Sequence, residues 1–282
     1  MKSRREFLKF SGSLAIGSLL LPQFSKAARS GKVKNVGIQL YAVRKEMMAD
    51  AVDTLKQLAK IGYKELESAR SEKGNYYGLS PKEIKKITKD LGMILRSGHV
   101  HQDEKWQQSI DEAVEAGQEY LIISTMPTRG QTVENYQRVA DAFSKAGEDC
   151  KKANLKFGYH NHSYEFEMEN GQVLYDVLLD RTEPDLVNME LDLGWVVAGG
   201  KDPLMYFDKY PGRFPLWHLK DVDLAKKEST EFGKGQVNIL GLLQNAKKSG
   251  MKHFFIEQEE YSINAMESMK YDFDFLTKLN VP

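Results

Sequence analysis

Residues 187–195 read Val187-Asn188-Met189-Glu190-Leu191-Asp192-Leu193-Gly194-Trp195, and this form recurs along the chain. A short apolar run of strand length ends at an acidic residue, and a stretch with helical periodicity follows it. Strands that alternate with helices in this way are typical of a parallel sheet.

Seven other short apolar runs are each followed within a few residues by polar, Gly or His positions. The eight predicted strands are Val36–Tyr41, Tyr63–Glu67, Ile94–Gly98, Tyr120–Ser124, Phe157–His160, Val187–Leu191, Leu216–Leu219 and His253–Glu257. Because eight strands close a barrel, we expect an α/β fold of the (β/α)8 TIM barrel type, formed by residues 36–282 as one domain. An open doubly wound sheet is the alternative, but no Gly-x-Gly-x-x-Gly motif follows the first predicted strand.

Residues 1–27 have the features of an export signal. The basic start includes Arg4-Arg5, an uncharged stretch covers residues 10–21, and Ser25-Lys26-Ala27 has small residues at both positions that specify cleavage. This resembles a twin-arginine signal peptide, followed by a short linker at residues 28–35. The apolar run is too short for a membrane-spanning helix, which needs about 20 residues. We therefore expect an exported, periplasmic protein without a stable membrane anchor.

Charge and cysteine content exclude several classes of protein. The 282 residues contain 40 Lys+Arg and 40 Asp+Glu, and removing residues 1–27 takes away five cations and one anion, which leaves a net charge of 35 − 39 = −4. A nucleic-acid partner is disfavoured, because such proteins normally carry a basic surplus. The single cysteine, Cys150, lies in a polar stretch and cannot form an intrachain disulfide. The hydrophobic core must therefore stabilise the fold.

Histidines and carboxylates gather at one end of the predicted strands. Five of the six histidines lie at or just beyond a strand's carboxyl end (His99, His101, His160, His162 and His218), whereas His253 lies at a strand start. In a parallel barrel the carboxyl ends of the strands meet at one rim, where active sites form. We interpret His253 as structural and the other five as candidate site residues.

Four of the polar residues suit a divalent cation. Asp192, His218 and Glu257 end three consecutive predicted strands, and Glu165 follows the strand before them. One imidazole and three carboxylates suit Mn²⁺, Mg²⁺, Co²⁺ or Zn²⁺, with coordination positions left open for substrate oxygens. We predict one divalent ion per chain, with Mn²⁺ as the favoured metal.

Several motifs together resemble one family. They include Gly37-Ile38-Gln39-Leu40-Tyr41, the run from His160 to Phe166 (His-Asn-His-x-x-Glu-Phe), Leu191-Asp192-Leu193-Gly194-Trp195 and His218-Leu219-Lys220-Asp221. The mature chain is similar throughout to the xylose isomerase-like TIM barrels, or sugar phosphate isomerases/epimerases, which are related in fold to endonuclease IV.

The resemblance implies a metal site contributed by the last four strands. It assigns Asp192, His218 and Glu257 as ligands, but the usual glutamate of the fifth strand has no direct counterpart. Glu165 is the nearest carboxylate, and His160 or His162 is the alternative. Trp195 replaces a histidine that many relatives have, so it either forms an aromatic wall for a sugar ring or packs in the core.

The expected chemistry is removal of a proton next to a carbonyl, which gives an enediolate. Glu165 and Glu257 are the candidate bases, and His99 and His162 are alternatives. Lys220 either binds a substrate oxygen or is a surface lysine paired with Asp221. The candidate substrate contacts are Gln39, Arg44, Glu67, His101, His160 and Trp195. The glycine-containing loop at residues 232–238 is interpreted as a turn rather than a phosphate site.

Three functions fit these features. The leading hypothesis is a metal-dependent sugar isomerase or epimerase. A lyase or hydratase acting on 3-keto-glycosides would use the same proton abstraction, and a catalytically inactive sugar-binding protein is the alternative from another class. A nuclease is disfavoured, because it would need more histidine ligands and a basic groove. A small carbohydrate is the expected partner, and a homo-oligomer is compatible with the sequence.

Overall fold

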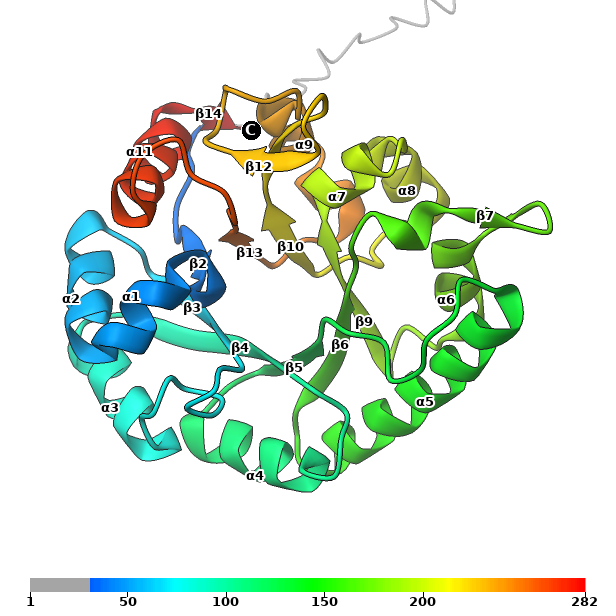
Figure 1. Cartoon of the computed structure of the whole chain (residues 1–282), viewed down its shortest axis with the longest axis horizontal. Coiled ribbons are helices and arrows are strands. Elements are labelled where there is room, and N and C mark those ends of the chain that lie inside the picture. Colours follow the sequence, from blue (N-terminus) through cyan, green and yellow to red (C-terminus); the bar gives the residue numbers. More distant parts are fainter. Residues whose placement is uncertain (1–30, 282) are drawn as a thin grey trace, which may run out of the picture.

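A computed structural model describes residues 31–281 as a closed barrel of eight parallel strands surrounded by helices (Figure 1). The signal peptide predicted for residues 1–27 lies outside the described residues. Going round the barrel from the first strand, the strands are β2 (Gly37–Gln39), β3 (Glu65–Ala69), β4 (Ile94–Val100), β5 (Tyr120–Ile123), β6 (Lys156–His160), β9 (Val187–Asp192), β10 (Leu216–Leu219) and β13 (His253–Ile256). The predicted TIM barrel is confirmed.

Helices form the outer layer. They are α1 (Arg44–Ala49), α2 (Ala51–Ile61), α3 (Pro81–Asp90), α4 (Trp106–Ala116), α5 (Val133–Lys152), α6 (Leu174–Arg181), α7 (Leu193–Ala198), α8 (Pro203–Lys209), α9 (Ile239–Gln244), α10 (Ala246–Ser249) and α11 (Ala265–Lys278), with short 3-10 helices η1 (Leu40–Val43) and η2 (Tyr164–Phe166). At the start of α3, Ser80 and Glu83 form the capping box that their spacing indicates. No helix in residues 31–281 has both the length and the apolar character needed to cross a membrane.

Three small antiparallel pairs lie outside the barrel: β1 (Gly31–Lys32) with β14 (Asn280–Val281), β7 (Met168–Glu169) with β8 (Gln172–Val173), and β11 (Asp221–Asp223) with β12 (Glu228–Thr230). The first pair joins the part of the chain that precedes β2 to the C-terminal segment. Part of the predicted linker is therefore attached to the domain.

Cys150 differs from its sequence-based description. Although polar residues flank it, the thiol lies on the face of α5 that packs inward and has no exposed surface. Burial, with Asp149 nearby, raises its pKa to about 12. The polar neighbours occupy the other faces of the same helix, so Cys150 belongs to the core.

The barrel interior has an apolar lower layer and a polar upper layer. Tyr120, Ile122, Leu216 and Phe255 form a separate buried cluster. Side chains two residues apart point to the same face of a strand. The residue two positions after a member of this cluster on the same strand therefore also faces inward, nearer the carboxyl end of the barrel. Leu216 is thus followed by His218, and Phe255 by Glu257. The alternation of side chains brings polar groups together above an apolar base.

Candidate active site

The rim quartet consists of His160, Asp192, His218 and Glu257, whose ligand atoms all lie within 4.8 Å of one another. Nε2 of His160 lies 3.4 Å from Oδ2 of Asp192 and 3.7 Å from Oε2 of Glu257. Nδ1 of His218 lies 2.8 Å from the same Glu257 oxygen. All four residues are buried. Two imidazoles and two carboxylates thus converge on one point.

Unpaired atoms in this quartet show that it fits a cation. Within residues 31–281, neither ring nitrogen of His160 has a hydrogen-bond partner, and the nearest group to Oδ2 of Asp192 is the Lys220 ammonium. Burial, together with His218, holds the pKa of His160 well below its ordinary value, so the neutral ring keeps a lone pair. Buried polar atoms are normally paired, and carboxylate oxygens and neutral imidazoles are the donors that divalent ions of the zinc and manganese type use.

Lys220 is buried beside the rim quartet. Its Nζ lies 2.9 Å from Oδ2 of Asp192, 3.0 Å from Oε2 of Glu257 and 3.0 Å from Oε1 of Glu259. It also lies 4.3 Å from the centre of the Trp195 ring. Burial alone would lower the pKa of Lys220, but these carboxylates raise it above its ordinary value, so the side chain is an ammonium ion. The alternative of a surface lysine paired with Asp221 is wrong.

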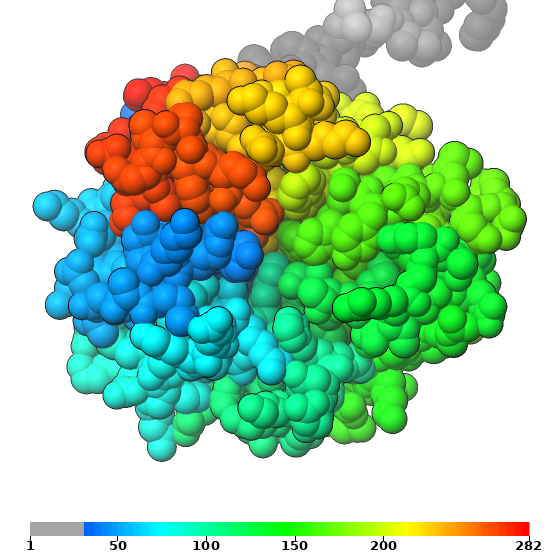
Figure 2. Space-filling view, viewed as in Figure 1, coloured from blue at the N-terminus to red at the C-terminus, as the bar shows by residue number. Residues whose placement is uncertain are grey.

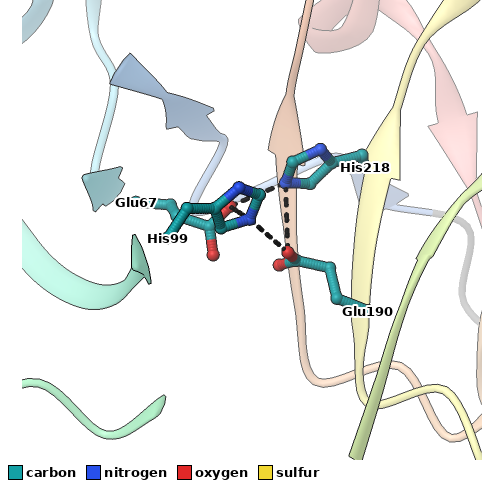
Figure 3. A group of neighbouring side chains, drawn as sticks. All are labelled: Glu67, His99, Glu190 and His218. Atoms are coloured by element: carbon teal, nitrogen blue, oxygen red, sulfur yellow. Dashed lines mark hydrogen bonds and ion pairs between the residues drawn. The ribbon is translucent and has the colours of Figure 1, made fainter. Parts of the chain in front are cut away.

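The deep quartet, formed by Glu67, His99, Glu190 and His218, lies beside the rim quartet (Figure 3). Nε2 of His99 lies 3.0 Å from Oε1 of Glu67 and 2.7 Å from Oε2 of Glu190. Nε2 of His218 lies 2.7 Å and 3.4 Å from the same two oxygens. The His218 ring therefore belongs to both quartets and presents one nitrogen to each.

Electrostatics in the deep quartet shift its pKa values in opposite directions. Burial would raise the pKa of Glu67, but His99 and His218 hold it below the ordinary value. Burial and the charge of Glu67 raise the pKa of Glu190 to about 7. Burial would lower the pKa of His99, but Glu67 and Glu190 raise it to about 10. Such opposed shifts are typical of functional sites.

A cavity of about 280 Å³ opens beside both quartets. Its lining comprises Tyr41, Ala69, Arg70, His99, His101, Ser124, Thr125, His160, His162, Glu257 and Glu259. Figure 2 shows a narrow hollow near the barrel centre, between early, middle and late segments of the chain. The volume is near the lower end of the range for ligand pockets, roughly 300–1,000 Å³. That size suits a single sugar ring better than a polymer.

Glu165 is the main departure from the predicted ligand set. It is buried, but its Oε1 accepts a hydrogen bond from Tyr159 at 2.5 Å and its Oε2 accepts one from the His162 backbone at 2.9 Å. It belongs to neither quartet and does not line the cavity. His160, the alternative ligand, lies in the rim quartet instead. Because η2 turns the chain back after β6, Glu165 supports the loop that carries His162.

Other predicted contacts are divided between the cavity and its surroundings. His101 and His162 line the cavity. Gln39 is buried and donates a hydrogen bond to Glu67 at 2.8 Å, so it acts through that carboxylate. Arg44 lies over the Tyr41 ring, outside the lining. Trp195 also lies outside the lining and packs against the Lys220 ammonium.

His253 lies at the opposite end of the barrel, as predicted. Its Nδ1 lies 2.7 Å from Oε2 of Glu65, and Arg96 donates a hydrogen bond to the other oxygen of this carboxylate. This pair is structural, because it contributes to neither quartet.

Sequence analysis missed Glu190, Arg70 and Glu259. Glu190 precedes Asp192 by two residues on one strand, so the period of two would have placed both carboxylates inside the barrel. Arg70 and Glu259 lie just beyond the ends of β3 and β13, and both line the cavity. Nothing in the local sequence sets these two apart from other charged loop residues.

The glycine-containing loop is confirmed as a turn. The Asp221 carboxylate accepts hydrogen bonds from four backbone amides, those of Val222, Gly233, Gly235 and Val237, at 2.8–3.0 Å. Such a ring of amides would otherwise suit an anion. Asp221 occupies the position that a phosphate would need.

Comparisons with known proteins agree with this architecture. The model of the xylose isomerase-like TIM barrel family matches residues 55–279. A crystal structure of a sugar phosphate isomerase/epimerase from Parabacteroides distasonis ATCC 8503 superposes with a TM-score of 0.77 and 28% identity, covering 89% of this chain and 95% of that one. The IolI protein with a bound zinc atom has the same fold, with a TM-score of 0.66, 14% identity and coverage of 85% and 95%.

Curated relatives match shorter stretches. Inosose dehydratase from Geobacillus kaustophilus is 26% identical over 212 residues, 63% of this chain and 66% of the relative. The enzyme of the same name from Lacticaseibacillus casei is 27% identical over 114 residues, and the match spans 40% of this chain and 37% of the relative. The family model covers most of the barrel and the site geometry lies at the expected rim, so the chain belongs to the xylose isomerase-like TIM barrel family.

Proposed function

We propose that the protein is a divalent-metal-dependent enzyme that removes a proton next to a carbonyl group of a small carbohydrate through an enediolate, as a sugar isomerase or epimerase. The observation that carries this proposal is the buried His160 ring at the cavity, whose two nitrogens have no hydrogen-bond partner in residues 31–281 and which faces the Asp192 and Glu257 carboxylates. The family of the chain, with its isomerases and epimerases, supports the same class of chemistry.

The rim quartet would hold the metal through one atom from each residue. An ion bound there would withdraw electron density from a substrate carbonyl and stabilise negative charge on its oxygen. Mn²⁺ is the first ion to test, because its chemistry suits carboxylates, and Zn²⁺ is the second, because two imidazoles suit it.

Residues of the cavity would handle the proton. Glu257 and His162 both line it and can accept a proton from a bound sugar. The carboxylate of Glu165 accepts a hydrogen bond from the His162 backbone and would position that residue rather than touch the substrate. Lys220 is an ammonium beside the same oxygens and would bind a substrate oxygen once the metal takes its place.

Elimination is a second candidate function. Once a proton has left the carbon next to a carbonyl, loss of a hydroxyl or glycosidic oxygen from the following carbon gives an unsaturated ketone instead of an isomer. The similarity to inosose dehydratases favours this outcome. The same residues serve both reactions up to the enediolate.

The test is a screen of the mature protein with Mn²⁺ or Zn²⁺ in D₂O against ketoses, keto-cyclitols and 3-keto-glycosides. An isomerase or epimerase returns a sugar with deuterium at the carbon next to the carbonyl, whereas elimination gives an unsaturated ketone. Glu257→Gln should abolish exchange, while Glu65→Gln, at the opposite end of the barrel, should retain it. Sugar binding without exchange or turnover would support the inactive binding protein and overturn the proposal.

A further inference from the structure

We propose that the deep quartet is a second divalent-cation site, suited to Zn²⁺, and that the His218 ring joins it to the rim site. This inference does not depend on the proposed reaction, because it concerns how many ions the barrel interior holds. It rests on the geometry, charge and unpaired atoms of Glu67, His99, Glu190 and His218.

The four ligand atoms, all within 4.8 Å of one another, are close to the spacing of a four-coordinate site. Zinc binds nitrogen and oxygen at about 2.0–2.2 Å, which places neighbouring ligand atoms of a tetrahedron roughly 3.3 Å apart. In the deep quartet, each of the two Nε2 atoms lies 2.7–3.4 Å from each of the two carboxylate oxygens. The four atoms converge from four different strands, β3, β4, β9 and β10, so the barrel itself maintains their spacing.

Imidazoles are the cationic neighbours of the deep-quartet carboxylates in residues 31–281. Over residues 31–281, no lysine or arginine nitrogen forms an ion pair with Glu67 or Glu190, whereas both rim carboxylates contact Lys220. Glu67 also accepts a hydrogen bond from the neutral amide of Gln39. Burying two carboxylates is costly unless cations compensate them. A divalent ion would supply that compensation in place of the protons on His99 and His218.

Unpaired oxygens are the second, independent observation. Oε2 of Glu67 and Oε1 of Glu190 are buried and have no hydrogen-bond partner in the described part of the chain. Each of these carboxylates therefore keeps a buried oxygen whose charge no protein donor offsets, besides the oxygen that faces the imidazoles. His99, which belongs to the deep quartet, also lines the cavity, so an ion has a route from solvent to this layer.

Joint occupancy also balances the charge of the two quartets taken together with Lys220. With an ion on each side, His218 would bind through Nδ1 and Nε2 and release its remaining ring proton to solvent. Four carboxylates and the ring anion then carry five negative charges. Two divalent ions and the Lys220 ammonium carry five positive charges.

The experiment measures zinc in the purified mature chain after dialysis against excess Zn²⁺ and then against metal-free buffer. We expect two ions per wild-type chain, and anomalous diffraction at the zinc edge should give one peak on each side of the His218 ring. Glu190→Gln should reduce the content to one ion at the rim. Glu65→Gln is the matched control, and it should keep two ions. Glu65 lies on the same strand as Glu67 and also contacts a histidine, His253, but it belongs to neither quartet.

A single anomalous peak in the wild type would overturn the proposal, as would two ions that persist in Glu190→Gln. Loss of an ion in Glu65→Gln would also overturn it, because the second ion would then belong to the His253 pair. If Glu190→Gln does not fold, the wild-type diffraction experiment decides alone. The rim site is tested separately by Asp192→Asn, so failure of one site leaves the other measurable.

Discussion

The ammonium of Lys220 lies 2.9 Å from Oδ2 of Asp192, an oxygen that also belongs to the rim quartet. An ammonium and a metal ion cannot both approach this oxygen closely without strong repulsion. Metal binding must therefore displace Nζ toward Glu259 and the face of the Trp195 ring, its other two neighbours.

Lys220→Met should therefore tighten binding of Mn²⁺ or Zn²⁺ at the rim by at least about tenfold, or roughly 1.4 kcal/mol. The variant removes a competing cation while retaining a long apolar side chain. Competition with a chromophoric chelator measures the affinity. Lys234→Met is the control, because Lys234 pairs with Glu231 outside both quartets. Unchanged affinity in Lys220→Met would mean that the ammonium does not compete.

Asp192→Asn and Glu165→Gln should distinguish a metal ligand, Asp192, from a residue that only supports the loop carrying His162. Asp192→Asn should lose the rim ion, so added metal should raise its melting temperature less than it raises that of the wild type. Glu165→Gln should keep the ion. Its melting temperature should fall by several degrees, because an amide cannot accept both hydrogen bonds that Glu165 accepts. Loss of the ion only in Glu165→Gln would restore Glu165 as the ligand.

Asp272 should make stability depend on pH. Burial, with Glu231 and Asp221 nearby, raises its pKa from 3.8 to about 8, so the folded state holds the proton while the unfolded state releases it above about pH 4. Its contribution is fully present below pH 3.8 and is lost as pH rises through about 8. Asp272→Asn should raise the melting temperature relative to wild type by several degrees at pH 8 and by less at pH 5. Calorimetry at both pH values measures the difference. An equal shift at both would contradict this assignment.

Asp221→Asn should destabilise the loop after β10. Each oxygen of the carboxylate accepts hydrogen bonds from two backbone amides. In asparagine an NH2 group replaces one of these oxygens and cannot accept the two hydrogen bonds made there. Each buried amide left without an acceptor costs about 1–3 kcal/mol. We expect thermal unfolding several degrees below wild type, with Asp223→Asn on the same strand as the milder control. Phosphate should not restore stability, and a restored melting temperature would show that the loop accepts an anion.

The export proposal concerns residues outside the described structure. Arg4→Lys combined with Arg5→Lys should block translocation, because a twin-arginine signal depends on that pair. Fractionation of cells into cytoplasm and periplasm gives the readout, and the purified mature protein provides the activity control. Normal appearance of the double variant in the periplasm would refute the signal assignment.

Local sequence patterns were sufficient for the barrel. Each β-α unit contains an apolar run, a helix cap such as Ser80 and a helical segment within about 30 residues. These local features were enough to predict the unit. The positions of Asp192, His218 and Glu257 at the ends of predicted strands also placed them at one rim. These features depend on neighbours in the chain, so they are visible without the fold.

Tertiary structure alone decided which side chains meet. Glu165 and His160 both follow the same apolar run, but the backbone turn at η2 directs Glu165 to Tyr159 and leaves His160 facing Asp192. Likewise, Lys220 looks like a surface residue until closure of the barrel buries it between strands. The pairing of His218 with Glu67, 151 positions away, arises from that closure. Such contacts depend on distances in space across the barrel, and no local period encodes those distances.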